Sequence, residues 1–554
     1  MSVSVRDLEA GFVAWPAEAA ARYRDLGYWA GRPLGDWLTA GADADPGAPA
    51  VIDTGVRLTH AELIARVDGA AQRMRALGLA PGDRIVLQLP NCWEQVVLLL
   101  ACLRLGVVPA LAVPAHRRQE IAAVVAAADA RALIVPDVLR DFDHQAMATD
   151  IAAGIAGLDH VLVLGAARDG NVDARALCAP ADDPAAARAE LDAIAPDSSS
   201  IALFLLSGGT TGMPKLIART HDDYAYMVTR SAHLCGFDRD TVYLAVLPLG
   251  YGYPMAGPGW LGALVRGGRV VIAASPAPER AFALIERERV TVTSLVPAAA
   301  QRWLEHRERD ASADLSSLRL LQCAASRLAD HVAERIPAVL GCSLQQVYGM
   351  SEGLLCFTRP DDPDEVVFHS QGRPICPDDE LRVVDEDGRD VPDGEPGILL
   401  TRGPYTARGY YGASPELNAR SFADGWYRTG DIVRRRPDGN LVIEGRDKDL
   451  IVRAGEKISA EEVENYAYQV PGVRLCAAVA MPDAEVGERI CLYVIADRAV
   501  TVDEVCAVMN AAGVAKFKLP ERVVLVRELP ATGVGKIDKK ALRADIARRL
   551  DQQR

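Results

Sequence analysis

A run of small residues in the middle of the chain has the composition of a phosphate-binding loop. Ser207-Gly208-Gly209-Thr210-Thr211-Gly212 offers many backbone N–H groups, and Lys215 adds a positive charge near its end. Glycine lets such a loop close around phosphate oxygens, because no Cβ blocks the approach. A Walker A loop needs a serine or threonine directly after its lysine to hold magnesium, and Leu216 stands there instead. The segment indicates a nucleotide-phosphate loop of another kind, although a surface turn would have a similar composition.

The segments around this loop alternate between strand and helix patterns. An apolar run, Ile201 to Leu206, leads into the loop and suits a buried strand. Val96 to Val113 is expected to be a buried helix running into a strand, and Gly165 to Ser200 a partly helical surface connection. Further strands are expected at 84–89, 132–135, 160–164, 242–247, 269–273, 290–296 and 319–324. Strands separated by helices in this way predict an α/β fold of doubly wound sheets.

The pattern changes twice toward the C-terminus. From Glu380 longer β-rich stretches with turns at Asp387-Gly388 and Asp438-Gly439 predict a β subdomain. After Gly445 a charged segment is followed by new strands at 473–481 and 491–496. We therefore predict a large domain over residues 1–445 and a small, mobile α+β domain over residues 446–554.

Composition limits the kinds of partner. The 554 residues carry a net charge of −14, which argues against binding to nucleic acid or to an anionic membrane. The N-terminus lacks the pattern of a secretory signal, and Arg104, Gly106 and Pro109 interrupt the most apolar stretch. The 11 cysteines form no CxxC pair, so we expect small core residues in a reducing cytoplasm. Small molecules and proteins remain as partners.

Five motifs in order carry a family resemblance: SGGTTGMPK from Ser207, YGMSEG from Tyr348, YRTGD from Tyr427, GRDKDLI from Gly445 and TGVGKIDKK from Thr532. Together they resemble the adenylate-forming superfamily of acyl-CoA ligases, adenylation domains and luciferases, over essentially the whole chain. The segments LLTRGPYTARGYY and GEKISAEEVEN are similar to free-standing aryl-acid AMP ligases, which start siderophore-type peptide assembly. The resemblance implies that a carboxylate attacks the α-phosphorus of ATP and that pyrophosphate leaves, with charge neutralisation and positioning supplying most of the rate.

The resemblance also implies roles for individual residues. Glu352 matches a glutamate that is associated with Mg²⁺, and Asp431 matches an aspartate that accepts hydrogen bonds from the ribose. Tyr348 matches a residue that packs on adenine. The remaining ATP-binding positions are Ser207, Gly208, Gly209, Thr210, Thr211, Gly212, Lys215, Ala324, Ala325, Ser326, Val347, Gly349 and Arg446. Relatives usually have Gly-Gly-Ala where this chain has Ala324-Ala325-Ser326. Taken singly, Glu352 and Asp431 would suit a helix start and a turn.

Lys536 matches the lysine that bridges the substrate carboxylate and the α-phosphate, and Lys448 matches the hinge. Within the superfamily the C-terminal domain is thought to rotate before a thiol attacks the acyl-adenylate. The resemblance implies a separate carrier protein as the thiol partner, with CoA as the alternative. An inactive nucleotide-binding regulator on the same fold is a further alternative, which the presence of Lys215, Glu352, Asp431 and Lys536 opposes.

The acid pocket departs from the relatives. Their usual His-Asn pair is replaced by Tyr251 and Gly252, and a common serine by Gly257. The other predicted pocket residues are Tyr253, Cys323, Ser351 and Leu355. A site that lost polar contacts to 2,3-dihydroxybenzoate would disfavour that acid by roughly 1 to 3 kcal/mol for each unpaired group. We therefore expect an aryl carboxylic acid that is bulkier or differently substituted, such as a hydroxyanthranilate or a picolinic or quinaldic acid; salicylate or 2,3-dihydroxybenzoate remains the alternative.

Overall fold

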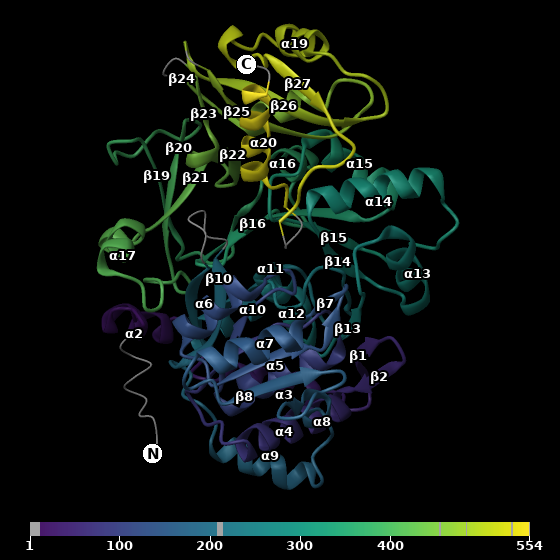
Figure 1. Cartoon of the computed structure of the whole chain (residues 1–554), viewed down its shortest axis with the longest axis vertical. Coiled ribbons are helices and arrows are strands. Elements are labelled where there is room, and N and C mark those ends of the chain that lie inside the picture. Colours follow the sequence, from purple (N-terminus) through teal and green to yellow (C-terminus); the bar gives the residue numbers. More distant parts are fainter. Residues whose placement is uncertain (1–10, 208–213, 454–455, 484, 533–535, 553–554) are drawn as a thin grey trace.

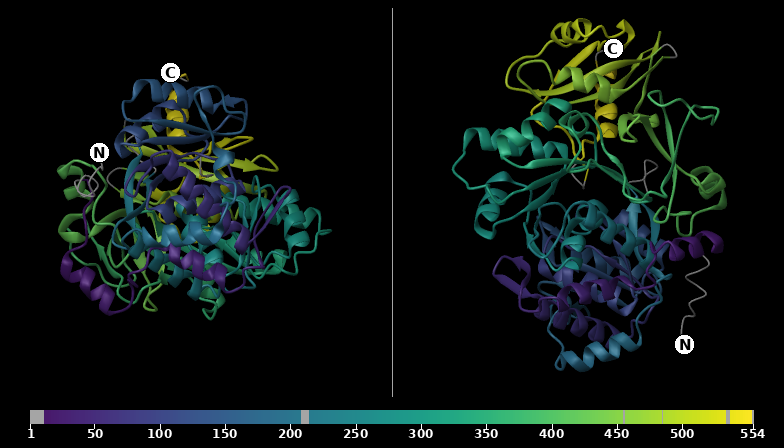
Figure 2. Two further views of the ribbon diagram at one scale, coloured as in Figure 1. Left: turned by 90° about the horizontal axis from the view of Figure 1, so that it is seen from below. Right: turned by 180° about the vertical axis from the view of Figure 1, so that it is seen from behind.

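The computed structural model describes residues 11–207, 214–453, 456–483, 485–532 and 536–552. Two large sheets form the lower part of the molecule, and two smaller ones lie beside and above them (Figure 1). Seen from behind, the C-terminal part again lies on the two-sheet core (Figure 2). Within the described residues, no helix combines the length and apolar character needed to span a bilayer.

The first sheet has seven strands in the order β11-β10-β4-β3-β5-β8-β9. Its bounds are β3 Arg84–Leu87, β4 Val108–Leu111, β5 Ala132–Pro136, β8 His160–Leu164, β9 Val172–Asp173, β10 Ile201–Ser207 and β11 Lys215–Thr220. The strands are parallel except for the β10–β11 hairpin. This order confirms the predicted doubly wound arrangement and leaves the phosphate-loop segment between β10 and β11.

The second sheet has nine strands in the order β18-β17-β16-β15-β14-β12-β13-β1-β2. Its bounds are β1 Pro49–Asp53, β2 Val56–Thr59, β12 Val242–Ala245, β13 Arg269–Ile272, β14 Val292–Leu295, β15 Leu320–Cys323, β16 Ser343–Met350, β17 Gly353–Phe357 and β18 Arg373–Pro374. Helix α5 (Trp93–Leu105) is buried on all sides and shares one apolar core with residues of both large sheets. A helix that is apolar all round is expected at such a central position.

Some predicted boundaries differ from the structure. Helix α5 begins at Trp93 instead of Val96, and β3 and β12 each end three residues before a proline, Pro90 and Pro248. In both places the strand stops earlier than the apolar pattern, which continues to Leu89 and Leu247. The connection 165–200 contains β9 and two helices, α8 (Ala174–Leu177) and α9 (Pro184–Ala193).

The predicted β subdomain is a four-stranded antiparallel sheet, β19 Glu380–Val384, β20 Pro396–Arg402, β21 Tyr427–Arg435 and β22 Leu441–Arg446. The last sheet consists of β23 Ile451–Arg453, β24 Glu456–Ile458, β25 Val473–Asp483, β26 Gly487–Ala496 and β27 Arg522–Leu525. Alternate residues of β25 pack in two separate cores, one against α18 (Ala460–Ala467) and α19 (Val502–Ala511) and the other against α20 (Lys539–Asp551). The predicted boundary at 445/446 falls at the end of β22.

Candidate active site

The hairpin of β10 and β11 carries the ends of the predicted phosphate loop. Ser207 and Lys215 are paired across it. The Ser207 hydroxyl is buried and has no hydrogen-bond partner in the described part of the chain. The predicted loop residues Gly208, Gly209, Thr210, Thr211 and Gly212 lie outside the described residues. The apolar strand therefore fixes where the loop begins and ends.

A tyrosine that the motifs did not single out joins Lys215 to Glu352. Glu352 lies in the turn between β16 and β17 and is 7% exposed. The Tyr410 hydroxyl donates to Glu352 Oε1 at 2.9 Å, and Lys215 Nζ lies 4.5 Å from the centre of the Tyr410 ring. Burial, and then the Glu352 charge, raise the pKa of Tyr410, so its hydroxyl keeps its proton for this bond. Two segments 137 residues apart in the sequence, at 215 and 352, thus meet in one place.

A second polar cluster surrounds Asp431, which is 4% exposed. Its carboxylate accepts a hydrogen bond of 2.7 Å from Tyr348 and pairs with Arg446 Nε at 2.8 Å. Asp431 and Arg446 face each other across β21 and β22. The nearby Asp431 carboxylate raises the pKa of Arg446 above its usual value. The Tyr348 hydroxyl thus points at Asp431, where the ribose is expected, and packing of the Tyr348 ring on adenine stays a prediction.

The other predicted ATP-binding residues lie at the ends of neighbouring strands. Ala324, Ala325 and Ser326 follow β15, while Val347 and Gly349 lie on β16. Ala325 has a φ of 79°, in the left-handed region that favours glycine. A Cβ on Gly349 would come within 2.7 Å of Leu355 Cδ1 and 3.0 Å of the Leu354 carbonyl oxygen, so a side chain there would force Leu355 to shift. Carboxyl ends of parallel strands are a common place for ligands in such sheets.

The structure places the predicted acid-pocket residues on three elements. Tyr251, Gly252, Tyr253 and Gly257 lie on or beside helix α11 (Gly252–Ala256), Cys323 ends β15, and Ser351 and Leu355 belong to the β16–β17 hairpin.

Two glycines face this hairpin. A Cβ on Gly252 would lie 3.4 Å from Leu205 Cδ1 and 3.8 Å from Ser351 Oγ. A Cβ on Gly257 would lie 3.6 Å from Tyr253 Cδ2 and 3.7 Å from Leu355 Cδ1. The Gly252 distances are ordinary contacts, whereas a Cβ on Gly257 would also lie only 3.3 Å from the Tyr253 carbonyl oxygen, which is tight. A larger residue at either position would therefore crowd Ser351 or Leu355.

Tyr253 is half-buried and packs against the apolar core that contains Cys323. Burial raises the pKa of Tyr253 well above its usual value, and the neighbouring Cys323 adds to the effect. The Tyr253 hydroxyl is buried with no hydrogen-bond partner in the described part of the chain. Tyr251 lies at the N-terminus of α11, with its amide bonded to Pro248 at 3.0 Å. Both tyrosine roles in acid binding remain predictions.

Lys536 lies between β27 and α20, in a segment that runs from the C-terminal sheet toward the core (Figures 1 and 2). The Lys536 carbonyl accepts a hydrogen bond from the Thr532 amide at 2.7 Å, and the Lys536 amide donates to the Thr532 hydroxyl at 3.2 Å. No hydrogen bond or ion pair joins its ammonium to Glu352 or Asp431 among the described residues. The hinge candidate Lys448 lies in the short 3-10 helix η2 (Asp447–Asp449). The structure thus does not bring Lys536 into contact with the two carboxylates.

Tyr410, Tyr427 and Arg219 are site-forming residues that sequence reasoning missed. Tyr427 lies 3.5 Å from Tyr410, hydroxyl to hydroxyl. Arg219 is fully buried, pairs with Asp223 and donates to the Ser351 carbonyl at 3.1 Å. The two tyrosines do fall inside quoted motifs, but no local signal marks Arg219. Within the described residues, no group of three or more His, Cys, Asp or Glu side chains is arranged to hold a metal ion.

Comparison with known proteins identifies the family of this chain. Residues 38–411 match the AMP-binding enzyme family and residues 462–536 its C-terminal domain. The chain is 59% identical to a 2-hydroxy-7-methoxy-5-methyl-1-naphthoate-CoA ligase of Streptomyces carzinostaticus, over 97% of this chain and 98% of that protein. It is 54% identical to a salicylyl-CoA synthase / salicylate adenylyltransferase of a Streptomyces species, over 97% and 98%. The apo structure of MbtA from Mycobacterium smegmatis superposes with a TM-score of 0.74 at 43% identity, over 97% of this chain and 99% of that one. The chain therefore belongs to the AMP-binding enzymes of the adenylate-forming superfamily and is an adenylate-forming ligase.

Proposed function

We propose that this ligase uses ATP to convert an aryl carboxylic acid to its aryl-AMP with release of pyrophosphate, and then transfers the aryl group to a thiol. One observation carries the proposal: Tyr410 contacts both Lys215 and Glu352. Asp431 is tied to the strand before Glu352 by its hydrogen bond from Tyr348. When an acid attacks the α-phosphorus, two anions approach each other, so cations placed in advance lower the barrier. In this proposal Lys215 and the loop before it hold the phosphates, Asp431 holds the ribose, and Lys536 bridges the two reacting groups.

Magnesium fits the donor set on the core side. Mg²⁺ in nucleotide sites usually binds one or two carboxylates together with phosphate oxygens and water. Glu352 supplies one carboxylate, which Tyr410 holds in place. When bound, the ion would neutralise phosphate charge. Glu352 would hold it, and Lys215 would supply the second positive charge at the same end of the site.

The substrate we propose is an aryl acid bulkier than 2,3-dihydroxybenzoate, or one substituted differently beside the carboxylate. Gly252 and Gly257 place no side chain beside Ser351 and Leu355, and Tyr253 and Leu355 would provide apolar walls. The name of the 59% identical relative, a naphthoate ligase, supports a two-ring acid with an ortho-hydroxyl group. A quinaldic acid has the same outline, and a hydroxyanthranilate would use the same space with an ortho-amino group.

For the thiol, the resemblance implied a carrier protein, and CoA is the alternative. The 59% and 54% identical relatives have CoA in their names, whereas one at 47% identity is named a salicyl-AMP ligase / salicyl-S-ArCP synthetase. We further propose that residues 446–554 act as a separate unit, which turns at Lys448 and withdraws Lys536 before the thiol attacks. Formation of the aryl-AMP would be the same whether CoA or a carrier protein accepts the aryl group.

Two assays test the proposal. The first is acid-dependent ATP–pyrophosphate exchange over a panel of naphthoic, quinaldic, picolinic, hydroxyanthranilic, salicylic and 2,3-dihydroxybenzoic acids; we expect the highest kcat/KM for a two-ring or ortho-amino acid. Clear preference for 2,3-dihydroxybenzoate would overturn the substrate assignment, and no exchange with any aryl acid would overturn the function. The second follows thioester formation with CoA and with a phosphopantetheinylated carrier protein, side by side.

A further inference from the structure

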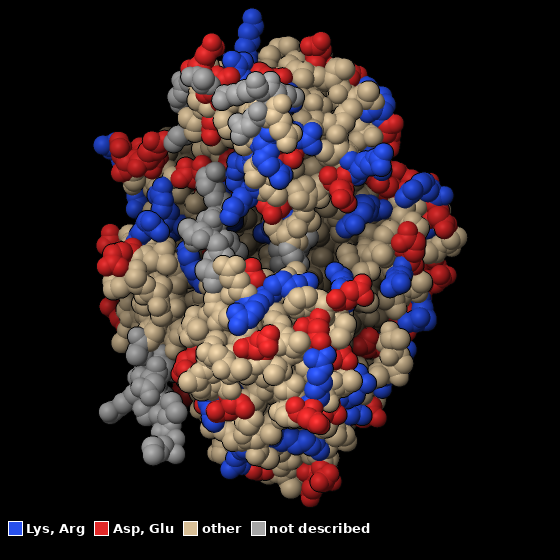
Figure 3. All heavy atoms as spheres, viewed as in Figure 1, with Lys and Arg blue, Asp and Glu red and all other residues tan. Residues whose placement is uncertain are grey.

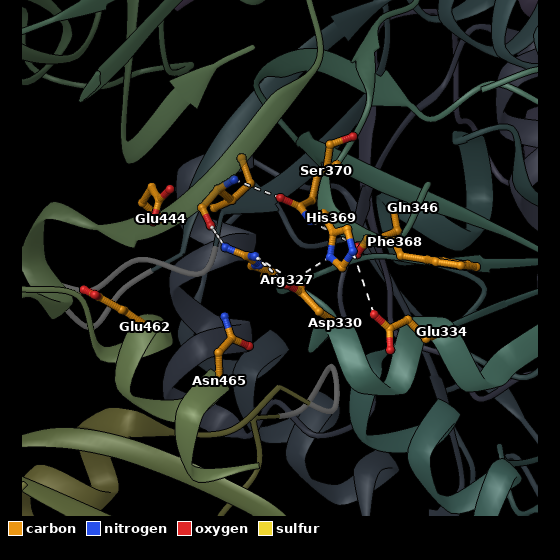
Figure 4. Close-up of polar contacts among 12 residues, drawn as sticks. Arg327, Asp330, Glu334, Gln346, Phe368, His369, Ser370, Glu444, Glu462 and Asn465 are labelled. Atoms are coloured by element: carbon orange, nitrogen blue, oxygen red, sulfur yellow. Dashed lines mark hydrogen bonds and ion pairs between the residues drawn. The ribbon is translucent and has the colours of Figure 1, made fainter. Parts of the chain in front are cut away.

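The guanidinium of Arg327 joins two segments of the candidate nucleotide site (Figure 4). Arg327 follows Ser326 directly, and its side chain is only 12% exposed. Its Nη1 donates to the carbonyl of Ile443 on β22 at 3.1 Å, and its Nη2 pairs with Asp330 at 3.1 Å. Ile443 lies three residues before Arg446, the partner of Asp431. One side chain therefore spans from the 324–326 loop to the strand that ends at Arg446.

The amide of Ile443 is held from the core as well. It donates to Gln371 Oε1 at 2.8 Å. Gln371 in turn donates to Gln346 Oε1 at 3.1 Å, and Gln346 donates to the carbonyls of Val367 and Phe368. Because β22 is an edge strand, its outer N–H and C=O groups need partners from elsewhere. Side chains of the core provide both partners at Ile443.

Arg327 is itself held in place. His369 Nδ1 lies 3.2 Å from Asp330 Oδ2, and His369 Nε2 lies 3.8 Å from Glu334 (Figure 4). A guanidinium fixed by a carboxylate loses little further rotamer freedom when it also bonds a carbonyl. The adjoining loop needs such support, since Ala325 holds a left-handed φ of 79° that alanine disfavours.

We propose that Arg327 is a positioning residue for nucleotide binding: it sets the distance between the loop 324–326 and β22, and thus the place of Arg446 and Asp431. Arg327 would act through these segments without touching the nucleotide. The inference rests on the proposed use of that loop and strand for ATP, and not on which acid is activated. A lysine at this position could reach the Ile443 carbonyl or Asp330, but not hold both in a fixed fork.

The test measures ATP affinity by calorimetry in the full-length protein without acid. We expect Arg327→Gln to weaken ATP binding by about tenfold, the equivalent of one charge-assisted hydrogen bond, and Arg327→Lys by about threefold. The matched control is Arg434→Gln, which removes an arginine that also bonds a β22 side chain, Glu444, and a carbonyl, Gly394, but contacts no residue of the 324–326 loop among the described residues. The control should bind ATP like the parent.

Urea unfolding of each variant separates positioning from folding. Weaker ATP binding at an unchanged unfolding midpoint, with partial rescue in Arg327→Lys, supports the proposal. Parental ATP affinity in Arg327→Gln overturns it, and so does a loss that Arg434→Gln shares. If Arg327→Gln does not fold, Arg327→Lys decides: intermediate affinity supports the proposal, and parental affinity overturns it. A parent that binds ATP but activates no aryl acid would overturn the proposed function and leave this measurement valid.

Discussion

The nucleotide side and the acid side of the candidate site are built in different ways. On the nucleotide side each carboxylate has a polar partner: Asp431 has Tyr348 and Arg446, and Glu352 has Tyr410. On the acid side the elements are two glycines, apolar walls and a buried tyrosine hydroxyl without a partner in the described structure. Acidic and basic side chains are interspersed over the surface around the hollow between the lower and upper parts (Figure 3).

This difference shows how one fold can keep a reaction and change its substrate. Charged groups at fixed places select for triphosphate and ribose, and few replacements preserve such bonds. Shape selects the acid, and a pocket changes shape whenever a side chain gains or loses volume. Variants on one side should therefore leave the other side intact.

The largest effect is expected for Lys536→Ala. Loss of an ammonium aimed at developing charge should lower acid-dependent pyrophosphate exchange by about 100-fold or more. Thioester formation from supplied aryl-AMP should stay within a few-fold of the parent, because Lys536 leaves the site before that step in our proposal. Equal losses in both half-reactions would contradict the separate role of the C-terminal segment.

A smaller but still large effect is expected for Asp431→Asn on the nucleotide side. Weaker bonds to the ribose should raise the KM for ATP by about 10-fold to 100-fold, since a hydrogen bond to a charged group contributes roughly 1.5 to 3 kcal/mol. The KM for the aryl acid, measured at saturating ATP, should change little. If both KM values rose together, the two sides would not be independent.

Gly252→Asn tests the acid side. The new side chain would start in ordinary contact with Leu205 and Ser351 and would narrow the pocket. We expect kcat/KM for a two-ring acid to fall by about tenfold and that for salicylate or 2,3-dihydroxybenzoate to be retained or to rise, with the KM for ATP unchanged. Turnover of the large acid at the parental rate would exclude Gly252 as part of the pocket wall.

The smallest effect concerns the stability of the fold and the carboxyl group of Asp379, which is linked to Leu355 through Tyr405. Asp379 accepts a bond from Tyr405, whose hydroxyl also accepts from the Leu355 amide at 3.3 Å. Burial raises the pKa of Asp379 from 3.8 to about 8. Between these values the folded protein holds a proton that the unfolded chain lacks, so the free energy of unfolding should fall as pH rises toward 8 and then level off.

Asp379→Asn removes this proton uptake and checks the sign. Between pH 5 and pH 8 the free energy of unfolding of the variant should rise by about 2 kcal/mol relative to that of the parent, measured by urea unfolding at each pH. The full pKa shift would give a larger difference, but relaxation of the folded protein around the ionised carboxylate reduces it. Parallel curves for the parent and Asp379→Asn would show that Asp379 is ionised in the folded protein.

Part of the fold was accessible from local patterns. The strand–helix alternation predicted the doubly wound α/β architecture, and the turns at Asp387-Gly388 and Asp438-Gly439 predicted a β subdomain, which is the four-stranded sheet. Strand ends were predicted less well, because the apolar pattern continues to Leu89 and Leu247 while the ladder stops before Pro90 and Pro248. Arg219 and Arg327 were not predicted, since their importance depends on carbonyls at Ser351 and Ile443, more than 100 residues away.

The amino-acid sequence by itself determined the family and the reaction class, and it predicted which residues would meet phosphate, ribose and carboxylate. These follow from motifs whose chemistry is carried by short segments. Only the tertiary structure decided that Tyr410 joins Lys215 to Glu352, that Tyr348 bonds Asp431, and that Gly252 and Gly257 face one hairpin. The reason is that such contacts depend on how sheets and helices pack, and a distance between distant segments is not encoded in either segment alone.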